Sequence, residues 1–448
     1  MLILAGVSIN LVIGQNGIIT KAGDAKKQTE QATANDQAAM SGLYDEMLGY
    51  LGEEIPLGKV GVNEKASKNS TINGESASAT NPIIPEGYIP IDTGTTSWGD
   101  GSSAPTEENV NKGLVIKDES GNEWVWVPVA DPSVMYETAS TPIELTGGGA
   151  ITDETVLNPL KQIKISKYSK SITITNNDNS TTTKTRVLPN DTSSFREPDV
   201  VVDNSGGTWY DAEDTNRATA GFTKTVGETT TTMTLAEMAD MMRSEYETMI
   251  ASIEKYHGFY IGRYELTEDG EKPGATLTET SWYQLYANCK TLSASNKVMS
   301  RMIWGCQWDV TCNWIANYGD KKNISDSSKW GNYYGTSVKA SDGTTEIKKS
   351  DKQQILDTGI TTFTRANNIY DFAGNCEEWT QEASGTSYRA SRGGSCINSR
   401  SSYPASHRND FVPAIVTLGS CVRFSSHFNS ATLIKGERVG IRQHKRMT

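Results

Sequence analysis

The longest regular pattern of apolar positions lies between residues 234 and 256. Apolar side chains recur there three or four positions apart, which is the spacing of one face of an α-helix. Gly258 follows, where a residue in the left-handed conformation commonly ends a helix. The pattern predicts a helix over residues 234–256 whose buried face consists of Leu235, Met238, Met242, Tyr246, Met249, Ile253 and Tyr256.

Alternation of apolar and polar residues predicts strands in other parts of the chain. Residues 113–129 give a strand, a Ser-Gly turn and a second strand, and residues 257–267 give another. Residues 171–187 alternate on both sides of an Asn-rich turn, as in a β-hairpin. Two shorter apolar patterns predict helices over 281–292 and 304–318. We therefore expect an α+β domain.

Changes of composition along the chain mark the expected domain boundary, a linker and an insertion. Residues 1–14 form an almost uncharged apolar run, shorter than the about 20 residues of a membrane-spanning helix, and residues 15–54 have helical composition and spacing. Residues 55–112 are rich in Ser, Thr, Gly, Asn and Pro without periodicity, which predicts an extended linker. The folded head is then expected over 113–448, with a Thr- and Asn-rich insertion at 131–232.

Charge and metal-binding residue types exclude several classes of function. The chain carries 54 acidic and 42 basic side chains, a net charge of −12, whereas binding to phosphates takes a basic face. We therefore expect no nucleic-acid partner. The six cysteines contain no C-x-x-C pair and the four histidines no H-x-x-x-H pair, so neither a zinc ribbon nor a histidine metal site is expected.

Two motifs lie close together between residues 368 and 395, and most of the expectations about fold and function depend on them. The first reads D-F-A-G-N-C-E-E-W-T from Asp371, and the second reads R-G-G-S from Arg392. Together they resemble the "D-x-x-G-N-x-x-E-W-T … R-G-G-S" signature of the formylglycine-generating-enzyme (sulfatase-modifying-factor) family. Residues 300–309, S-R-M-I-W-G-C-Q-W-D, resemble a further motif of that family. The resemblance implies an α+β head with a C-type-lectin-like fold of the formylglycine-generating-enzyme type.

The first motif has two interpretations. In the resembled family this turn holds a structural calcium, and the matching ligands here are the side chains of Asp371 and Glu378 and the carbonyls of Gly374 and Cys376. Several oxygens of this kind are what calcium prefers. Alternatively, Asp371 caps the turn and Glu378 pairs with an arginine such as Arg392.

The second motif bears on catalysis. The enzymes of the resembled family bind copper through two cysteines, five positions apart, shortly after R-G-G-S. The matching positions here are Asn398 and Tyr403, so we expect no copper and no enzymatic activity. Cys396 and Cys421 leave a residual oxidase open as the alternative.

Residues 396–442 form a mosaic in which side-chain type changes almost at every position. This layout after R-G-G-S resembles the variable proteins of diversity-generating retroelements, in which a lectin-like C-terminal region is hypermutated. The resemblance implies a ligand-binding face, with contacts expected at Asn398, Arg400, Ser402, His407, Asn409, Asp410, Phe411, Val412, Ile415 and Thr417.

The N-terminal segment bears on where the protein is located. Residues 1–54 resemble the N-terminal helix of pilin-like proteins with its first half missing. That resemblance implies anchorage to a membrane or pilus through the missing part and an extracellular head at the cell surface. The expected function is that of a receptor or adhesin for a protein or other surface ligand. A structural minor pilin is a further alternative.

Overall fold

The computed structural model divides the chain into two units, Met1–Pro56 and Leu57–Thr448. The structure describes residues 56–132, 168–175, 181–188, 195–196, 214–233, 235–278, 280–292, 298–320, 324, 326–384, 388–399, 403–411, 413, 420–422 and 424–428. The expected pilin-like helix in residues 1–54 lies outside them. All that follows concerns the second unit.

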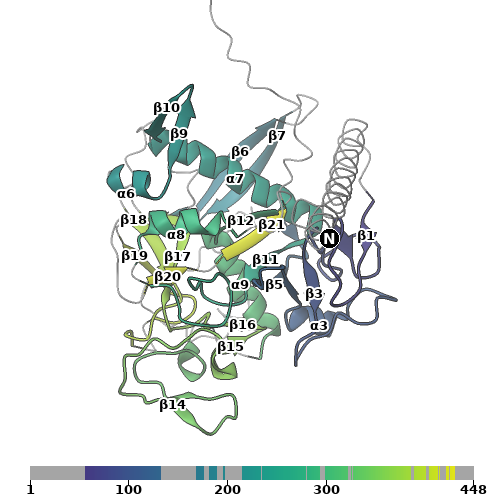
Figure 1. The fold of residues 1–448 in the computed structure, drawn as a ribbon, viewed down its shortest axis with the longest axis vertical. Helices are drawn as coiled ribbons and strands as arrows, with labels where there is room; N and C mark the ends of the chain where they lie inside the picture. The colour runs from purple at the N-terminus through teal and green to yellow at the C-terminus, as the bar shows by residue number, and fades with distance from the viewer. Residues whose placement is uncertain are drawn as a thin grey trace, which may run out of the picture. The chain divides into compact units, whose positions relative to one another are not determined.

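A six-stranded antiparallel sheet lies at the centre of the second unit, with the strand order β12-β21-β11-β5-β4-β3. Strand β21, from near the C-terminus, is inserted between β11 and β12 (Figure 1). The strands are β3 (Ile89–Ile91), β4 (Val115–Lys117), β5 (Glu123–Pro128), β11 (Gly258–Gly262), β12 (Val298–Met302) and β21 (Phe424–Phe428).

A second sheet carries both motifs of residues 368–395. Its order is β19-β18-β17-β20, and β8 also pairs with the end of β17. Strands β17 and β20 run parallel, and β18 is antiparallel to both β17 and β19. The strands are β8 (Phe195–Arg196), β17 (Glu377–Ser384), β18 (Tyr388–Arg392), β19 (Arg408–Phe411) and β20 (Ser420–Val422).

Smaller elements complete the described part of the chain. The paired strands are β1 (Gly58–Lys59) with β2 (Ser70–Thr71), β6 (Tyr168–Thr175) with β7 (Thr181–Leu188), β9 (Thr223–Val226) with β10 (Thr229–Thr232), β13 (Val338–Lys339) with β14 (Glu346–Lys348), and β15 (Arg365–Ala366) with β16 (Ile369–Tyr370). The helices are α3 (Glu107–Asn111), α6 (Asp214–Thr219), α7 (Leu235–Tyr256), α8 (Trp282–Cys289) and α9 (Gly305–Tyr318), with short 3-10 turns at Ser327–Lys329 and Thr362–Thr364.

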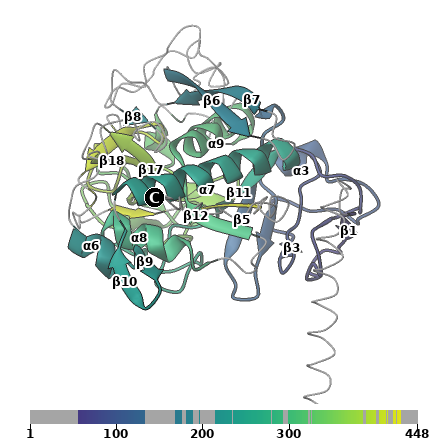
Figure 2. The same ribbon diagram turned by 90° about the horizontal axis from the view of Figure 1, so that it is seen from above.

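The elements predicted from periodicity are confirmed. Helix α7 packs on β11 (Figure 2) and also on β21. Five residues of its predicted face are fully buried: Met238, Met242, Tyr246, Met249 and Ile253. The hairpins β4–β5 and β6–β7 and the helices α8 and α9 also lie where they were expected. The head is therefore a mixed α and β structure. None of the described helices combines the length and apolar character that a membrane crossing requires.

The end of α7 differs from the prediction. His257, with φ of +58°, is the left-handed residue after the helix, and its N–H donates to the carbonyl of Ile253 at 2.8 Å. Gly258 instead begins β11. A Cβ at this glycine would lie 2.2 Å from the Trp126 indole, so packing against that ring requires glycine.

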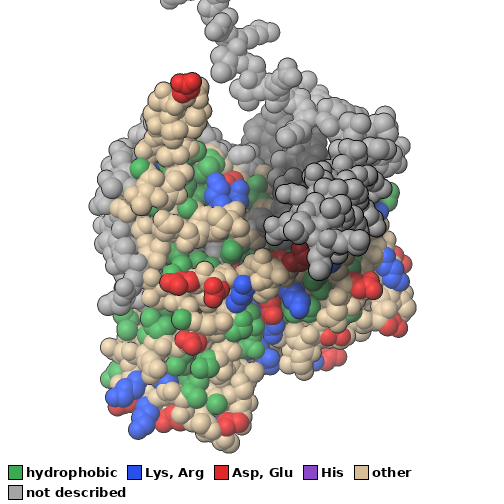
Figure 3. Space-filling view, viewed as in Figure 1, with side chains coloured by type: hydrophobic (Ala, Val, Ile, Leu, Met, Phe, Trp, Pro, Cys, Tyr) green, Lys and Arg blue, Asp and Glu red, His purple; other side chains and the backbone are tan. Residues whose placement is uncertain are grey.

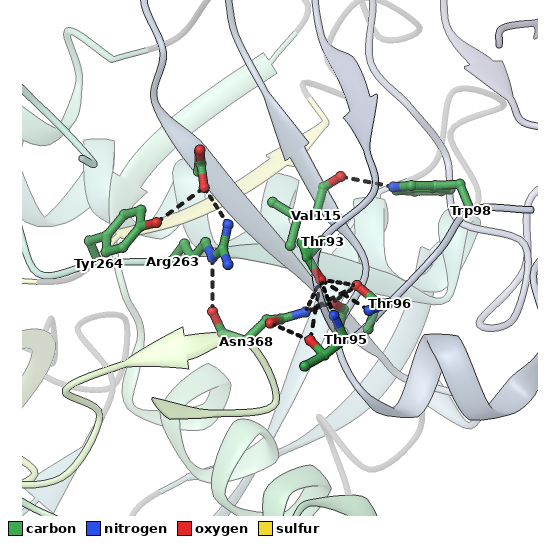
Figure 4. A network of polar contacts seen from close by, with 10 residues as sticks. Thr93, Thr95, Thr96, Trp98, Val115, Arg263, Tyr264 and Asn368 are labelled. Atoms are coloured by element: carbon green, nitrogen blue, oxygen red, sulfur yellow. Dashed lines mark hydrogen bonds and ion pairs between the residues drawn. The ribbon is translucent and has the colours of Figure 1, made fainter. Parts of the chain in front are cut away.

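The prediction of an extended linker over residues 55–112 is wrong from Leu57 onward. They belong to the compact second unit, supply β3 to the central sheet, and place Ile83, Ile84 and Trp98 in the core. Hydrogen bonds hold this segment against the rest of the unit (Figure 4). The Asn368 side-chain amide donates to Thr96 at 3.1 Å, and the Trp98 indole N–H donates to the Val115 carbonyl at 2.8 Å. Isolated apolar residues between polar turns bury this segment without any periodic pattern.

Candidate binding site

Asn375 lies at the centre of the D-F-A-G-N turn. Its side-chain oxygen accepts from Asn332 at 2.8 Å and from the Leu356 N–H at 2.9 Å, and its own carbonyl accepts from the Cys396 N–H at 2.9 Å. Its side-chain amide donates to Glu265, a fully buried carboxylate that also accepts from the Cys376 N–H at 3.2 Å. This one asparagine thereby ties four distant segments together.

Sequence reasoning missed Glu265. It follows β11 in the stretch F-Y-I-G-R-Y-E, where the periodicity of the strand alone does not show that the carboxylate is buried. Its two side-chain oxygens accept from Thr276, Asn375 and Cys376. A buried carboxylate supplied with several donors in this way is a structural anchor for the turn.

Three of the four candidate calcium ligands lie in the turn before β17, and Glu378 lies in β17 itself. Asp371 Oδ2 accepts from the Thr358 hydroxyl at 2.9 Å and from the Gly359 N–H at 3.1 Å, so these bonds tie the turn to an earlier segment instead of capping it. Gly374, Cys376 and Glu378 are all buried. Within the described residues no group of three or more His, Cys, Asp or Glu side chains could hold a metal ion. Calcium at this turn stays a prediction.

A closed ring of four buried charges joins the second sheet to helix α9. Asp309 pairs with both Arg392 and Arg408. Glu382 also pairs with both, at 3.1 Å to Arg392 and 2.9 Å to Arg408. We call these four residues the arginine–carboxylate ring. It holds two positive and two negative charges, and each side chain is at most 4% exposed.

Each ionised side chain of the ring is stabilised by the opposite charges beside it. Burial disfavours a charged guanidinium, but the carboxylates of Asp309 and Glu382 outweigh it and raise the pKa of Arg392 above its ordinary value. Hydrogen bonds between ionised partners are also stronger than those between neutral ones. Removing one member leaves an uncompensated buried charge, so the ring is stable only when complete.

The ring closes the base of a loop. Arg392 ends β18, Arg408 begins β19, and the two face each other directly in the pairing of these strands. Residues 393–407 are the connection between them. Like charges opposite each other across a sheet repel, and the ring neutralises this pair with two carboxylates that lie outside the loop. The charge balance of the base is thus provided by two residues outside the 393–407 loop, Asp309 and Glu382.

Within the loop, the first residues are held closely. Gly393 and Gly394 have φ of +85° and +69°, and a Cβ on Gly394 would lie 2.3 Å from the Tyr403 carbonyl. Asn398 turns its side-chain oxygen inward to accept from the Ser395 N–H at 2.7 Å and the Ser395 hydroxyl at 2.6 Å. By contrast, Ile397 beside it is 49% exposed. The described tip of the loop is therefore an ordered turn that presents Ile397 outward.

The structure places the predicted ligand contacts unevenly. Asn398 caps the loop turn, and Asn409 and Phe411 are half-buried on the edge strand β19, where Asn409 donates to Glu377 at 3.3 Å and Phe411 packs edge-on against Trp379. Asp410 also belongs to β19. His407 is only 7% exposed and so lies beneath the surface. Arg400, Ser402, Val412, Ile415 and Thr417 lie outside the described residues.

The surroundings of His407 predict a dependence of stability on pH. Burial, and then the charges of Arg392 and Arg408, lower its pKa from 6.5 to about 4. The unfolded chain therefore binds a proton that the folded chain does not, and stability is lost as the pH falls from about 6.5 to about 4. A shift of this size is worth up to about 3 kcal/mol at pH 4.

Urea unfolding at pH 7 and at pH 4 measures this loss. Carboxylates elsewhere also titrate in this range, so the comparison is with a His407→Gln variant. We expect the variant to lose about 3 kcal/mol less than the parent between the two pH values. Equal losses in the two proteins would contradict the assignment.

Cys396 follows the R-G-G-S step and is buried. Burial raises the pKa of its thiol from 9.0 to about 11, although the nearby charge of Lys348 lowers it. At pH 8 the thiolate fraction is then about 100-fold below that of an ordinary cysteine. The side chain of Cys421 lies outside the description, while its backbone pairs with Glu378 in β17.

We accordingly expect Cys396 to be unreactive in the folded protein. Alkylation by iodoacetamide at pH 8, followed by mass spectrometry of the peptide, should be at least about 100-fold slower in the native chain than in urea. A native rate close to that in urea would show an accessible thiolate, as an oxidase would need.

Comparison with known proteins adds little to this geometry. No protein-family model and no curated protein sequence matches the chain. Among solved structures, Treponema denticola variable protein 1 aligns with 14% identity over 38% of this chain and 84% of that one, with a TM-score of 0.27. A crystal structure of CarF aligns with 16% identity over 38% of this chain and 86% of that one, with a TM-score of 0.26. Scores this low do not establish a shared fold.

Proposed function

We propose that this chain is a ligand-binding protein whose recognition surface includes the 393–407 loop and strand β19. The observation that carries the proposal is the arginine–carboxylate ring, which fixes both ends of the loop through buried side chains. A loop whose two ends are fixed loses less conformational entropy on binding than a loop with free ends. Its exposed positions are also free to vary, because all four charges of the base lie outside the loop.

The finer fold belongs to the same proposal. We assign the head to the C-type-lectin-like fold of the formylglycine-generating-enzyme type. In support, the two motifs lie against each other as one unit: the Gly374 N–H donates to the Gly393 carbonyl at 2.9 Å, and the Cys396 N–H donates to the Asn375 carbonyl. The two halves of the signature thus form one local structure.

We propose binding rather than oxidation. The burial of Cys396, which raises the pKa of its thiol, supports this choice, because copper ligation requires thiolates. A copper- or oxygen-dependent activity that is abolished by Cys396→Ser would overturn it.

The partner in this proposal is a protein or another surface ligand rather than a nucleic acid. On the face shown in Figure 3, hydrophobic side chains gather in the lower part of the described surface, and acidic and basic side chains are interspersed around them. Mixed surfaces of this kind suit protein recognition, whereas phosphate backbones call for a basic stripe. Display at the cell surface or on a pilus, through the N-terminal segment, is part of the same proposal and rests on the resemblance of residues 1–54 to the N-terminal helix of pilin-like proteins.

Diversification by a retroelement is the part of the proposal that DNA can test. The gene's 3′ end would be sequenced from many related cells, and the downstream DNA searched for an imperfect repeat beside a reverse transcriptase. Substitutions confined to residues 396–442 and matched to adenines of such a repeat are the expected result. A uniform 3′ end without a repeat would reject diversification and leave a fixed adhesin or a minor pilin.

A further inference from the structure

Two hydroxyl groups outside the C-terminal region connect the two arms of the 393–407 loop. The Tyr333 hydroxyl donates to the Gly393 carbonyl at 2.9 Å and lies 2.8 Å from the Ser327 hydroxyl. The Ala405 N–H donates to the Ser327 side-chain oxygen at 3.0 Å. We call this chain of three hydrogen bonds the hydroxyl bridge. It runs from Ala405, near the end of the loop, to Gly393, its first residue.

The direction of every bond in the hydroxyl bridge is determined. The Tyr333 hydroxyl has one hydrogen, which the Gly393 carbonyl accepts, so Ser327 donates the bond between the two hydroxyls. Each hydroxyl therefore donates once and accepts once. Burial raises the pKa of Tyr333 well above its ordinary value, so this hydroxyl keeps its hydrogen. Ser327, Tyr333 and Ala405 are fully buried, and removing one hydroxyl leaves its partner unsatisfied there.

Each arm of the loop is also attached to a different element outside it. The Gly393 carbonyl accepts a second bond, from the Gly374 N–H at 2.9 Å, and the Ala405 carbonyl accepts from the Trp308 indole at 3.0 Å. The first attachment is to the D-F-A-G-N turn and the second is to α9. The hydroxyl bridge joins these two attachments across the loop, one step further from the base than the arginine–carboxylate ring.

The segment that carries Tyr333 also reaches the described tip of the loop. The Tyr333 carbonyl accepts from the Lys348 ammonium at 2.8 Å, and the N–H of the next residue, Tyr334, donates to the Asn398 carbonyl at 3.1 Å. Asn398 directly follows Ile397, which is 49% exposed. The position of Tyr333 therefore bears on the residue that the tip presents outward.

We propose that Ser327 and Tyr333 are positioning residues of the binding surface, whose hydroxyl bridge sets the separation of the two arms of the loop and thereby the orientation of Ile397. The inference rests on the proposed function and adds to it two residues that lie outside the sequence motifs and outside residues 396–442. A loop whose arms are fixed relative to each other loses less conformational freedom when it binds.

The test uses the full chain, and the probe is a single-domain antibody selected against the native protein. Only an antibody whose binding is abolished by Ile397→Ser is kept, because it reports the native geometry of the tip. We expect Tyr333→Phe and Ser327→Ala each to raise its Kd about tenfold or more. The double variant should be within about twofold of the single variants, since either substitution already breaks the bridge. In hydrogen exchange, the peptide containing Ala405 should lose protection in all three.

Two controls separate positioning from general destabilisation. A second antibody, dependent on the exposed Val226 of the β9–β10 hairpin, should bind every variant with unchanged Kd. Tyr260 is a matched buried tyrosine whose hydroxyl donates to the Ile83 carbonyl at 2.9 Å, outside the loop. Tyr260→Phe should change the Kd of the Ile397-dependent antibody less than about twofold.

Two results would overturn the positioning role. One is an unchanged Kd of the Ile397-dependent antibody with both single variants. The other is a loss of binding by both antibodies, which would show that the two hydroxyls stabilise the whole head rather than the loop. Because the antibodies are raised against the chain itself, either result leaves the proposed function intact.

Discussion

Replacing Asp309 by asparagine is expected to lower the free energy of unfolding by about 3–5 kcal/mol, because two buried guanidinium ions are then left with one carboxylate. Asp309 is 3% exposed and pairs with both Arg392 and Arg408. Urea unfolding at pH 7, followed by tryptophan fluorescence, measures the change. A loss below about 1 kcal/mol would show that water or another group compensates the charge.

Two comparisons separate the charge balance from other effects. Glu108→Gln breaks an exposed pair with Lys112 and should leave the urea midpoint nearly unchanged, because solvent screens that pair. Arg408→Gln alone leaves the ring with excess negative charge, but combined with Asp309→Asn it leaves one cation and one anion. The double variant should therefore lose less stability than the sum of the single variants, and strict additivity would argue against a coupled ring.

Gly374→Ala is expected to destabilise the head by more than about 3 kcal/mol, through both conformational strain and steric overlap. Gly374 has φ of +72°, and an added Cβ would lie 2.5 Å from the backbone oxygen of Asn332. That oxygen cannot move aside easily, because Asn332 is fully buried and its side chain bonds to Asn375. Urea unfolding again gives the magnitude.

Gly343 supplies the matched control. Its φ of +74° is nearly the same, but nothing lies within 4 Å of its Cβ position. Gly343→Ala should therefore cost only the strain of a left-handed alanine, about 1 kcal/mol. Similar losses at the two glycines would mean that the close approach of Asn332 contributes nothing.

The sequence predicted the elements whose apolar residues repeat with a regular period. Helix α7 was predictable because Met238, Met242 and Met249 must share one face of any helix formed there, and that face is buried. The β6–β7 hairpin was predictable for a similar local reason, since its strands flank a short turn. The segment after Leu57 was not predictable in this way, because its buried residues follow no period and its strands are two or three residues long.

In the candidate site, too, some features follow from the sequence and others only from the tertiary structure. The sequence by itself determined the two signature motifs, the turn in the first of them and Arg392 in the second. The structure shows that Gly374 and Asn375 in this turn have positive φ. Only the tertiary structure decided which groups meet. Asp309 reaches its two arginines across 83 and 99 positions of sequence, and Glu265 reaches Asn375 across 110. Such pairings follow from how sheets and loops pack around a common core, which local propensity does not encode. For the same reason the sequence could not show that His407 is buried or that Tyr334 forms a bridge with Ser399 of the 393–407 loop.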